Sequence, residues 1–159
     1  MDDEFQFKLG LLKQEMDTVQ NGIRTYGQVQ FTIKGWAITI FSGFIFFATK
    51  ETKPIFLSLS AVAVILFWIL DATFKSLQQV YIERATKIEE FLQGLTPSQG
   101  GKAFDKFTVP NIESTFNNLN GLAKARGVLR AGLMLQLALL YIVMLAVIGV
   151  LVFLKTGQP

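Results

Sequence analysis

Cysteine and histidine are both missing from this chain of 159 residues. Without cysteine there is no disulfide framework and no thiolate nucleophile, and without histidine there is no imidazole base and none of the usual zinc sites. The only glycine–lysine neighbours, Gly101 and Lys102, lack the surrounding residues of a phosphate-binding loop. Acidic residues are scattered in no pattern typical of a metal cage. We therefore expect a protein that is not an enzyme and that holds no cofactor and no metal.

Charged residues are also scarce, at 17% of the chain, whereas 51% of the residues are hydrophobic. The mean hydropathy of +0.42 is unusually high for a soluble domain of this length. The acidic start of the sequence does not resemble a secretory signal. We therefore expect the hydrophobic segments farther along to remain in the mature protein.

Three uncharged runs dominate the sequence, at 35–49, 55–70 and 132–154. The last has 23 residues, and a helix of that length spans a hydrocarbon core of roughly 30 Å. The two shorter runs cross a membrane only if neighbouring residues also lie within it. Alternatively, they are buried core helices of a soluble domain, but the third run beside them favours the membrane.

The predicted fold class is therefore all-α: an integral membrane protein with three transmembrane helices and a cytosolic, coiled-coil-like helical stalk. A cytosolic amphipathic helix is expected over 1–29, and transmembrane helices over 30–49 and 54–71. A cytosolic helical segment follows over 72–131, with a loop at 96–110. The third transmembrane helix is expected over 132–154.

Lysine and arginine are unevenly divided among these segments. Four precede residue 35, two lie in the link at 50–54, eight lie between the second and third runs, and one follows the third. The positive-inside rule then places the N-terminus and the central segment in the cytosol, with the C-terminus outside. The link is short and ends in Pro54, which suits a tight helical hairpin. We expect this topology in the bacterial inner (plasma) membrane.

Asp71 ends the second apolar run, and folding the hairpin about its tip brings it to the same depth as Lys34. We predict a structural ion pair between Lys34 and Asp71, because pairing or snorkelling offsets most of the cost of a charge near hydrocarbon. Trp36 and Trp68 lie at about the same depth, as in an aromatic belt. Two alternatives remain: Asp71 bonds to Lys75 one turn along, or the charges ring a pore entrance in an oligomer.

Two segments repeat apolar residues with heptad spacing, which is typical of packed helices. One lies ahead of the first span, and the other begins at the end of the second span. Since one helix runs toward the membrane and the other away from it, we predict an antiparallel pair. The first seam comprises Phe5, Leu9, Leu12, Met16, Val19, Ile23 and Tyr26. The second comprises Leu70, Phe74, Leu77, Tyr81, Arg84, Ile88, Phe91 and Leu95.

Small and polar residues within the spans are candidates for a pore lining or a helix interface. Gly35, Thr39 and Gly43 recur at every fourth position with Ser42 on the same face, and small residues let helices approach closely. This face packs either within one chain or between subunits. Gln136 in the last span needs a hydrogen-bond partner, which a second subunit could supply.

Four basic residues of the central segment are candidate contacts for a cytosolic partner or an anion: Arg84, Lys124, Arg126 and Arg130. The last three precede the third run, where their main expected role is to orient it beside the anionic inner leaflet. Phosphate binding is the alternative, and direct binding of nucleic acid is left open.

Two stretches together resemble a group of small bacterial membrane proteins: "KGWAITI" at 34–40 and "FWILDATFKSLQQVYIER" at 67–84. In that group Lys-Gly-Trp opens the first span, and Trp-x-Leu-Asp precedes an amphipathic helix with aromatic residues and arginine. The resemblance covers residues 20–92. The architecture expected for this chain is also similar to that of certain membrane effectors of anti-phage defence. Those effectors are paired with nucleotidyltransferases, as in the Hailong system.

This resemblance implies a homo-oligomeric pore- or channel-forming effector of antiviral defence, controlled by a cytosolic partner such as a nucleotidyltransferase or by a nucleotide signal. Two other functions fit the residues. One is a non-conducting membrane scaffold that recruits soluble partners through its heptad helices, and the other is an accessory subunit of a transporter.

Overall fold

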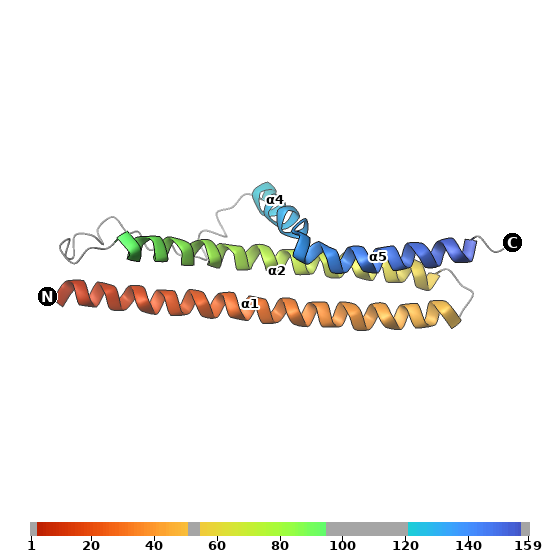
Figure 1. The fold of residues 1–159 in the computed structure, drawn as a ribbon, viewed down its shortest axis with the longest axis horizontal. Helices are drawn as coiled ribbons and strands as arrows, with labels where there is room; N and C mark the ends of the chain where they lie inside the picture. The colour runs from red at the N-terminus through yellow and green to blue at the C-terminus, as the bar shows by residue number, and fades with distance from the viewer. Residues whose placement is uncertain (1–2, 51–54, 95–120, 157–159) are drawn as a thin grey trace.

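The computed structural model describes residues 3–50, 55–94 and 121–156. Its elements are the helices α1 (Asp3–Lys50), α2 (Ile55–Gly94), α4 (Gly121–Gly132) and α5 (Leu135–Thr156), shown in Figure 1. The predicted all-α fold class is thus confirmed for these ranges. The predicted loop at 96–110, residues 51–54 of the link and the end of the tail lie outside them.

Helices α1 and α2 are long because nothing interrupts them where each predicted span meets its cytosolic segment. The chain has only four prolines, and none falls inside a described helix. With 48 residues in α1 and 40 in α2, the helices measure about 72 and 60 Å at about 1.5 Å per residue. Each therefore continues well beyond the roughly 30 Å of a hydrocarbon core.

The two long helices lie antiparallel and side by side, and α5 packs against the half of this pair that holds the apolar runs (Figure 1). Lys155 near the end of α5 donates a hydrogen bond to the carbonyl oxygen of Ala48, two residues before α1 ends. α4 leaves the bundle obliquely from the other end of α5. The chain turns between α4 and α5, so the last helix begins at Leu135, three residues later than the predicted third span.

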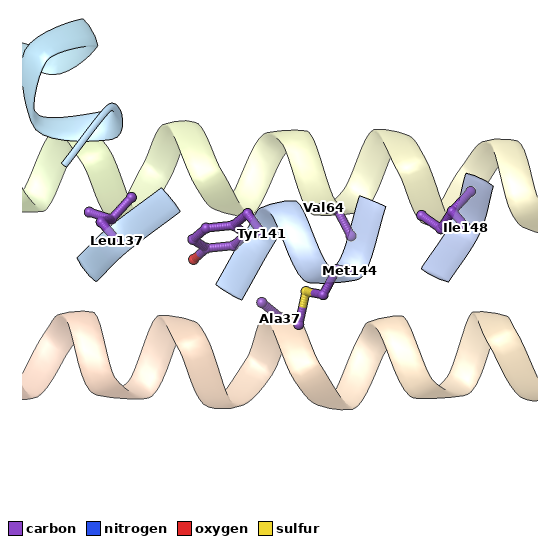
Figure 2. Packing of buried hydrophobic residues seen from close by; sticks show 6 residues of the cluster. All are labelled: Ala37, Val64, Leu137, Tyr141, Met144 and Ile148. Carbon is purple, nitrogen blue, oxygen red and sulfur yellow. The ribbon is translucent and has the colours of Figure 1, made fainter. Parts of the chain in front are cut away.

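One apolar core lies among α1, α2 and α5. Figure 2 shows Ala37 of α1 and Val64 of α2 converging on side chains of α5. The α5 members of this cluster are Leu137, Tyr141, Met144 and Ile148. Their spacing of three or four residues places them on one face of the helix, and the opposite face of α5 is exposed, as at Ile142 and Val150.

A second apolar core lies between α1 and α2, in the half that α5 does not reach. Leu12, Val19 and Ile88 are buried there, with Met16 and Tyr81 packed against them. Most residues of the two predicted heptad seams therefore do face the partner helix. Leu70 is an exception, because it is 43% exposed while the adjacent Asp71 is buried.

Three of the described helices are long and apolar enough to cross a membrane: α1, α2 and α5. Large apolar side chains on these helices remain uncovered by the rest of the chain, among them Trp36 at 64% and Phe153 at 75% exposure. Contiguous exposed apolar surface of this kind marks a lipid or protein contact. The structure thus supports a membrane protein with three candidate spans.

Candidate functional site

Asp71 is a polar residue of the bundle whose side chain is fully buried. Its Oδ2 atom lies 3.1 Å from Lys34 Nζ on α1. The same oxygen accepts a hydrogen bond of 3.1 Å from the Tyr141 hydroxyl on α5. One carboxylate oxygen of α2 therefore joins all three candidate spans.

The position of Asp71 on α2 explains its burial. Leu57, Val64, Asp71 and Gln78 recur every seventh residue, and all four are buried against the other helices. Residues at this spacing follow one stripe of a helix. The carboxylate is thus directed into the bundle, where an unpaired charge would be costly.

The structure brings Lys34 and Asp71 together and gives Lys75 a different partner. Lys75 Nζ donates to Gln78 Oε1 at 2.9 Å, so the alternative pairing of Asp71 with Lys75 is not observed. The second carboxylate oxygen, Asp71 Oδ1, is buried with no hydrogen-bond partner among residues 3–50, 55–94 and 121–156. Lys34 keeps 30% of its side chain exposed.

Tyr141 was not among the residues singled out from the sequence, yet it completes this site. It is fully buried, and its ring stacks on Trp68 with 6.3 Å between centroids. The Trp68 indole N–H in turn donates to the Gly132 carbonyl oxygen at 3.1 Å. The two tryptophans thus differ, because Trp68 is half-buried against the core while Trp36 is exposed.

A second polar layer lies at Gln78, the next residue of this buried stripe and seven residues after Asp71. Gln30 Nε2 donates to Gln78 Oε1 at 3.1 Å, and Gln78 Nε2 donates to the Ile23 carbonyl oxygen at 2.9 Å. Both glutamines are buried. Sequence analysis missed this layer, although a glutamine in each helix near the predicted seams was available as a clue.

Arg84 is not placed where the sequence analysis expected a partner or anion contact. Its side chain is only 6% exposed, and its Nη2 atom lies 2.6 Å from Glu15 Oε1. Its Nε atom donates to the same oxygen at 2.7 Å. This correction has a simple physical reason: the residue lies on the seam between the helices, so its charge is paired within the chain.

Tyr26 and Tyr81 lie close together between these polar layers, with 5.4 Å between ring centroids. Burial raises the pKa of Tyr81 above its ordinary value, and the charge and hydrogen bonding of Tyr26 raise it further. The Tyr81 phenol therefore stays neutral at physiological pH. The two tyrosines hold α1 and α2 together by packing, which is a structural role.

The other candidate cations lie apart from Arg84. Arg126 and Arg130 are exposed on α4, whereas Lys124 belongs to the same helix but its side chain lies outside the described part of the chain. α4 contains no acidic residue. The structure thus leaves a basic helix beside the bundle.

The small-residue face of α1 is not covered by the other helices that the structure describes. Gly35, Thr39 and Ser42 are exposed, and a methyl group added at Gly35 or Gly43 would meet no described atom within 4 Å. Gln136, which belongs to α5, is also exposed. Thr39 Oγ1 bonds to the Gly35 carbonyl at 3.0 Å, and Ser42 Oγ to the Ile38 carbonyl at 2.8 Å. Among residues 3–50, 55–94 and 121–156, these residues therefore do not form a contact between helices.

No protein-family model, no curated protein and no solved structure matches this chain.

The chemistry of the site therefore has to be judged from its own geometry. Asp71, Lys34 and Tyr141 form a closed arrangement in which one charge neutralises another and a hydroxyl completes the contact. Among the residues that the structure describes, no group of acidic side chains is arranged to hold a metal ion. The arrangement can lock three helices in one register, which is a structural and mechanical role.

Proposed function

We propose that this chain is a non-enzymatic, homo-oligomeric protein of the bacterial inner membrane that forms a pore or channel as an effector of anti-phage defence. Its N-terminus and central segment lie in the cytosol and its C-terminus outside. A cytosolic partner such as a nucleotidyltransferase, or a nucleotide signal, controls its opening through the stalk formed by α1 and α2.

The observation that carries this proposal is the contrast between the two sides of α1. Ala37 on the inner side belongs to an apolar core filled by side chains of α2 and α5, so one chain has no room for a conducting path there. Thr39 and Ser42 on the outer side are uncovered, and their hydroxyls are satisfied by their own helix. A polar path would thus have to form between subunits, with this face as a lining or a contact.

The continuity of the long helices supports control from the cytosol. Three polar contacts fix α1 against α2 in successive layers: Lys34 with Asp71, Gln30 with Gln78, and Glu15 with Arg84. Mispairing would bury unsatisfied polar groups, so the layers favour one register. A partner that tilts the far end of the pair would therefore move the membrane end with it.

Cysteine cross-linking tests the subunit contact directly, since the natural chain has no cysteine. Single variants Thr39→Cys and Gly43→Cys should form disulfide-linked dimers when membranes are oxidised. The matched control Ala37→Cys places the thiol in the intrachain core and should stay monomeric. Equal cross-linking at all three positions, or none at Thr39→Cys and Gly43→Cys, would contradict the proposed face.

Potassium efflux from liposomes tests conduction. Purified protein is reconstituted and measured alone and with the purified product of the adjacent gene. We expect efflux that Thr39→Leu reduces, because the larger side chain narrows an inter-subunit path. Cross-linked oligomers without efflux in either condition would favour the non-conducting scaffold instead, whereas an adjacent gene for an ATPase or a second membrane component would favour the transporter subunit.

A further inference from the structure

An apolar groove lies between α2 and α4, on the outer surface of the bundle. It has a volume of about 260 Å³, below the roughly 300–1,000 Å³ of pockets for drug-sized ligands. From α2 it is lined by Ile65, Trp68 and Ile69, and from α4 by Val128 and Leu129, with Leu133 directly after α4. The only polar group among these side chains, the indole N–H of Trp68, is already bonded to Gly132.

The groove lies at the end of the second predicted span that is nearest the cytosol. Ile65, Trp68 and Ile69 come within two turns before Asp71, where the uncharged run stops, and Ala72, which also lines the groove, follows it directly. The end of α4 is fixed at this level because the Gly132 carbonyl oxygen accepts a hydrogen bond from Trp68. The helices also approach closely here, since a methyl group added at Gly132 would lie 3.4 Å from Ala72 Cβ. The groove therefore opens at the depth where acyl chains meet lipid headgroups.

Leucines and arginines alternate along the uncovered face of α4 and the first residue after it. Arg126, Leu129 and Arg130 are spaced by three and one residues, so they share one side of the helix, and Leu133 follows directly after its end. Leu129 and Leu133 are 66% and 74% exposed although both line the groove. Apolar side chains in the acyl region with arginines reaching the headgroups are typical of helices that lie in a membrane interface.

We propose that this groove and α4 form a binding site for an anionic phospholipid of the cytosolic leaflet. One segment of acyl chain occupies the groove, and Arg126 and Arg130 bind the phosphate of the headgroup. A helix without acidic residues that carries two exposed arginines complements such a headgroup. The site rests on the membrane placement within the proposed function, and it is independent of whether the protein conducts.

Fluorescence of Trp68 provides the test, since the chain has only two tryptophans and Trp68 lines the groove. The variant Trp36→Phe is reconstituted in phosphatidylcholine vesicles that contain a minor fraction of acyl-brominated phosphatidylglycerol or acyl-brominated phosphatidylcholine. We expect stronger quenching by the brominated phosphatidylglycerol. Each arginine should contribute about fivefold to its relative association constant.

Adding Arg126→Gln and Arg130→Gln to this variant should abolish the difference between the lipids. The matched control adds Lys13→Gln and Arg24→Gln, which remove the same charge from exposed positions of α1 and should leave the difference unchanged. Loss of selectivity in both pairs of variants would indicate a general charge effect and overturn the site. Equal quenching by the two lipids before any arginine is removed would also overturn it.

Absence of quenching by both lipids would mean that protein, such as a second copy of the chain, covers the groove, and would overturn the proposal as well. Flotation of the vesicles separates this result from a failure of the proposed function. Protein that does not float with vesicles contradicts both proposals. Protein that floats but shows no lipid selectivity contradicts the lipid site alone.

Discussion

The Tyr141 hydroxyl of α5 donates a hydrogen bond to the same oxygen of Asp71 that contacts Lys34. This contact ties the third candidate span to a hairpin that already pairs two opposite charges. Because the carboxylate is fully buried, the contacts with Lys34 and Tyr141 offset the free energy that burying its charge costs. The site is therefore a junction of three helices, and disturbing any member should affect how the other two pack.

Removing the lysine should lower the free energy of unfolding more than neutralising the aspartate does. We expect Lys34→Met to lower the free energy of unfolding by about 3 kcal/mol, because it leaves a buried carboxylate without its counter-charge. Asp71→Asn should cost less, since Lys34 is 30% exposed and can reach solvent. The double variant should be more stable than Lys34→Met alone, as measured by thermal unfolding in detergent followed by circular dichroism. Additive losses in the double variant would contradict the direct pairing of the two side chains.

The hydroxyl of Tyr141 can be removed without removing its ring. We expect Tyr141→Phe to cost about 1.5–3 kcal/mol, as for hydrogen bonds to charged groups, while stacking on Trp68 is retained. In an Asp71→Leu background the same substitution should cost much less, because the acceptor is gone. The measurement is the shift in unfolding temperature in both backgrounds. Equal shifts would show that the hydroxyl acts through some other group.

The proximity of Lys34 and Asp71 could be predicted because helix geometry is regular. Once two uncharged runs are joined by a short link, a fixed rise per residue sets which positions share a depth. Rotation about the helix axis is not set in this way. The heptad analysis chose Leu70 where the structure buries Asp71, since an apolar residue beside a charge is the obvious choice for a seam.

Tyr141 could not be found from the sequence for a related reason. α5 is apolar on all sides and carries no acidic residue and only one basic residue, Lys155, so its pattern does not show which face turns inward. Its register against the hairpin also depends on the turn after α4. Arg84 does lie on the predicted seam, but its ion pair was not expected. A charged residue in a seam is usually assumed to reach outward, and its partner Glu15 lies in a different helix, far away in the sequence.

The pair of Glu15 and Arg84 should contribute to stability far more than exposed charges of the same helices. We expect Arg84→Gln to cost about 2 kcal/mol, because it leaves Glu15, only 18% exposed, without its counter-charge. The matched control Arg24→Gln removes an exposed arginine, and such substitutions usually stay within about 0.5 kcal/mol. Unfolding temperatures of the two variants in the same detergent give the comparison. Similar values would show that burial of Arg84 does not strengthen its ion pair.

Two glycines of α1 should respond in opposite ways to the same substitution. A methyl group added at Gly22 would lie 2.5 Å from ring atoms of Tyr81, whereas one added at Gly10 would meet no atom within 4 Å. Alanine normally stabilises a helix interior by about 1 kcal/mol relative to glycine, so Gly10→Ala should raise the unfolding temperature. Gly22→Ala should lower the unfolding temperature, because overpacking costs about 1–3 kcal/mol. The Tyr81 ring packs against Tyr26, which limits how far it can move away. Adding Tyr81→Ala to Gly22→Ala should make the glycine replacement harmless, and a loss that persists there would show that the close approach of the two helices is not its cause.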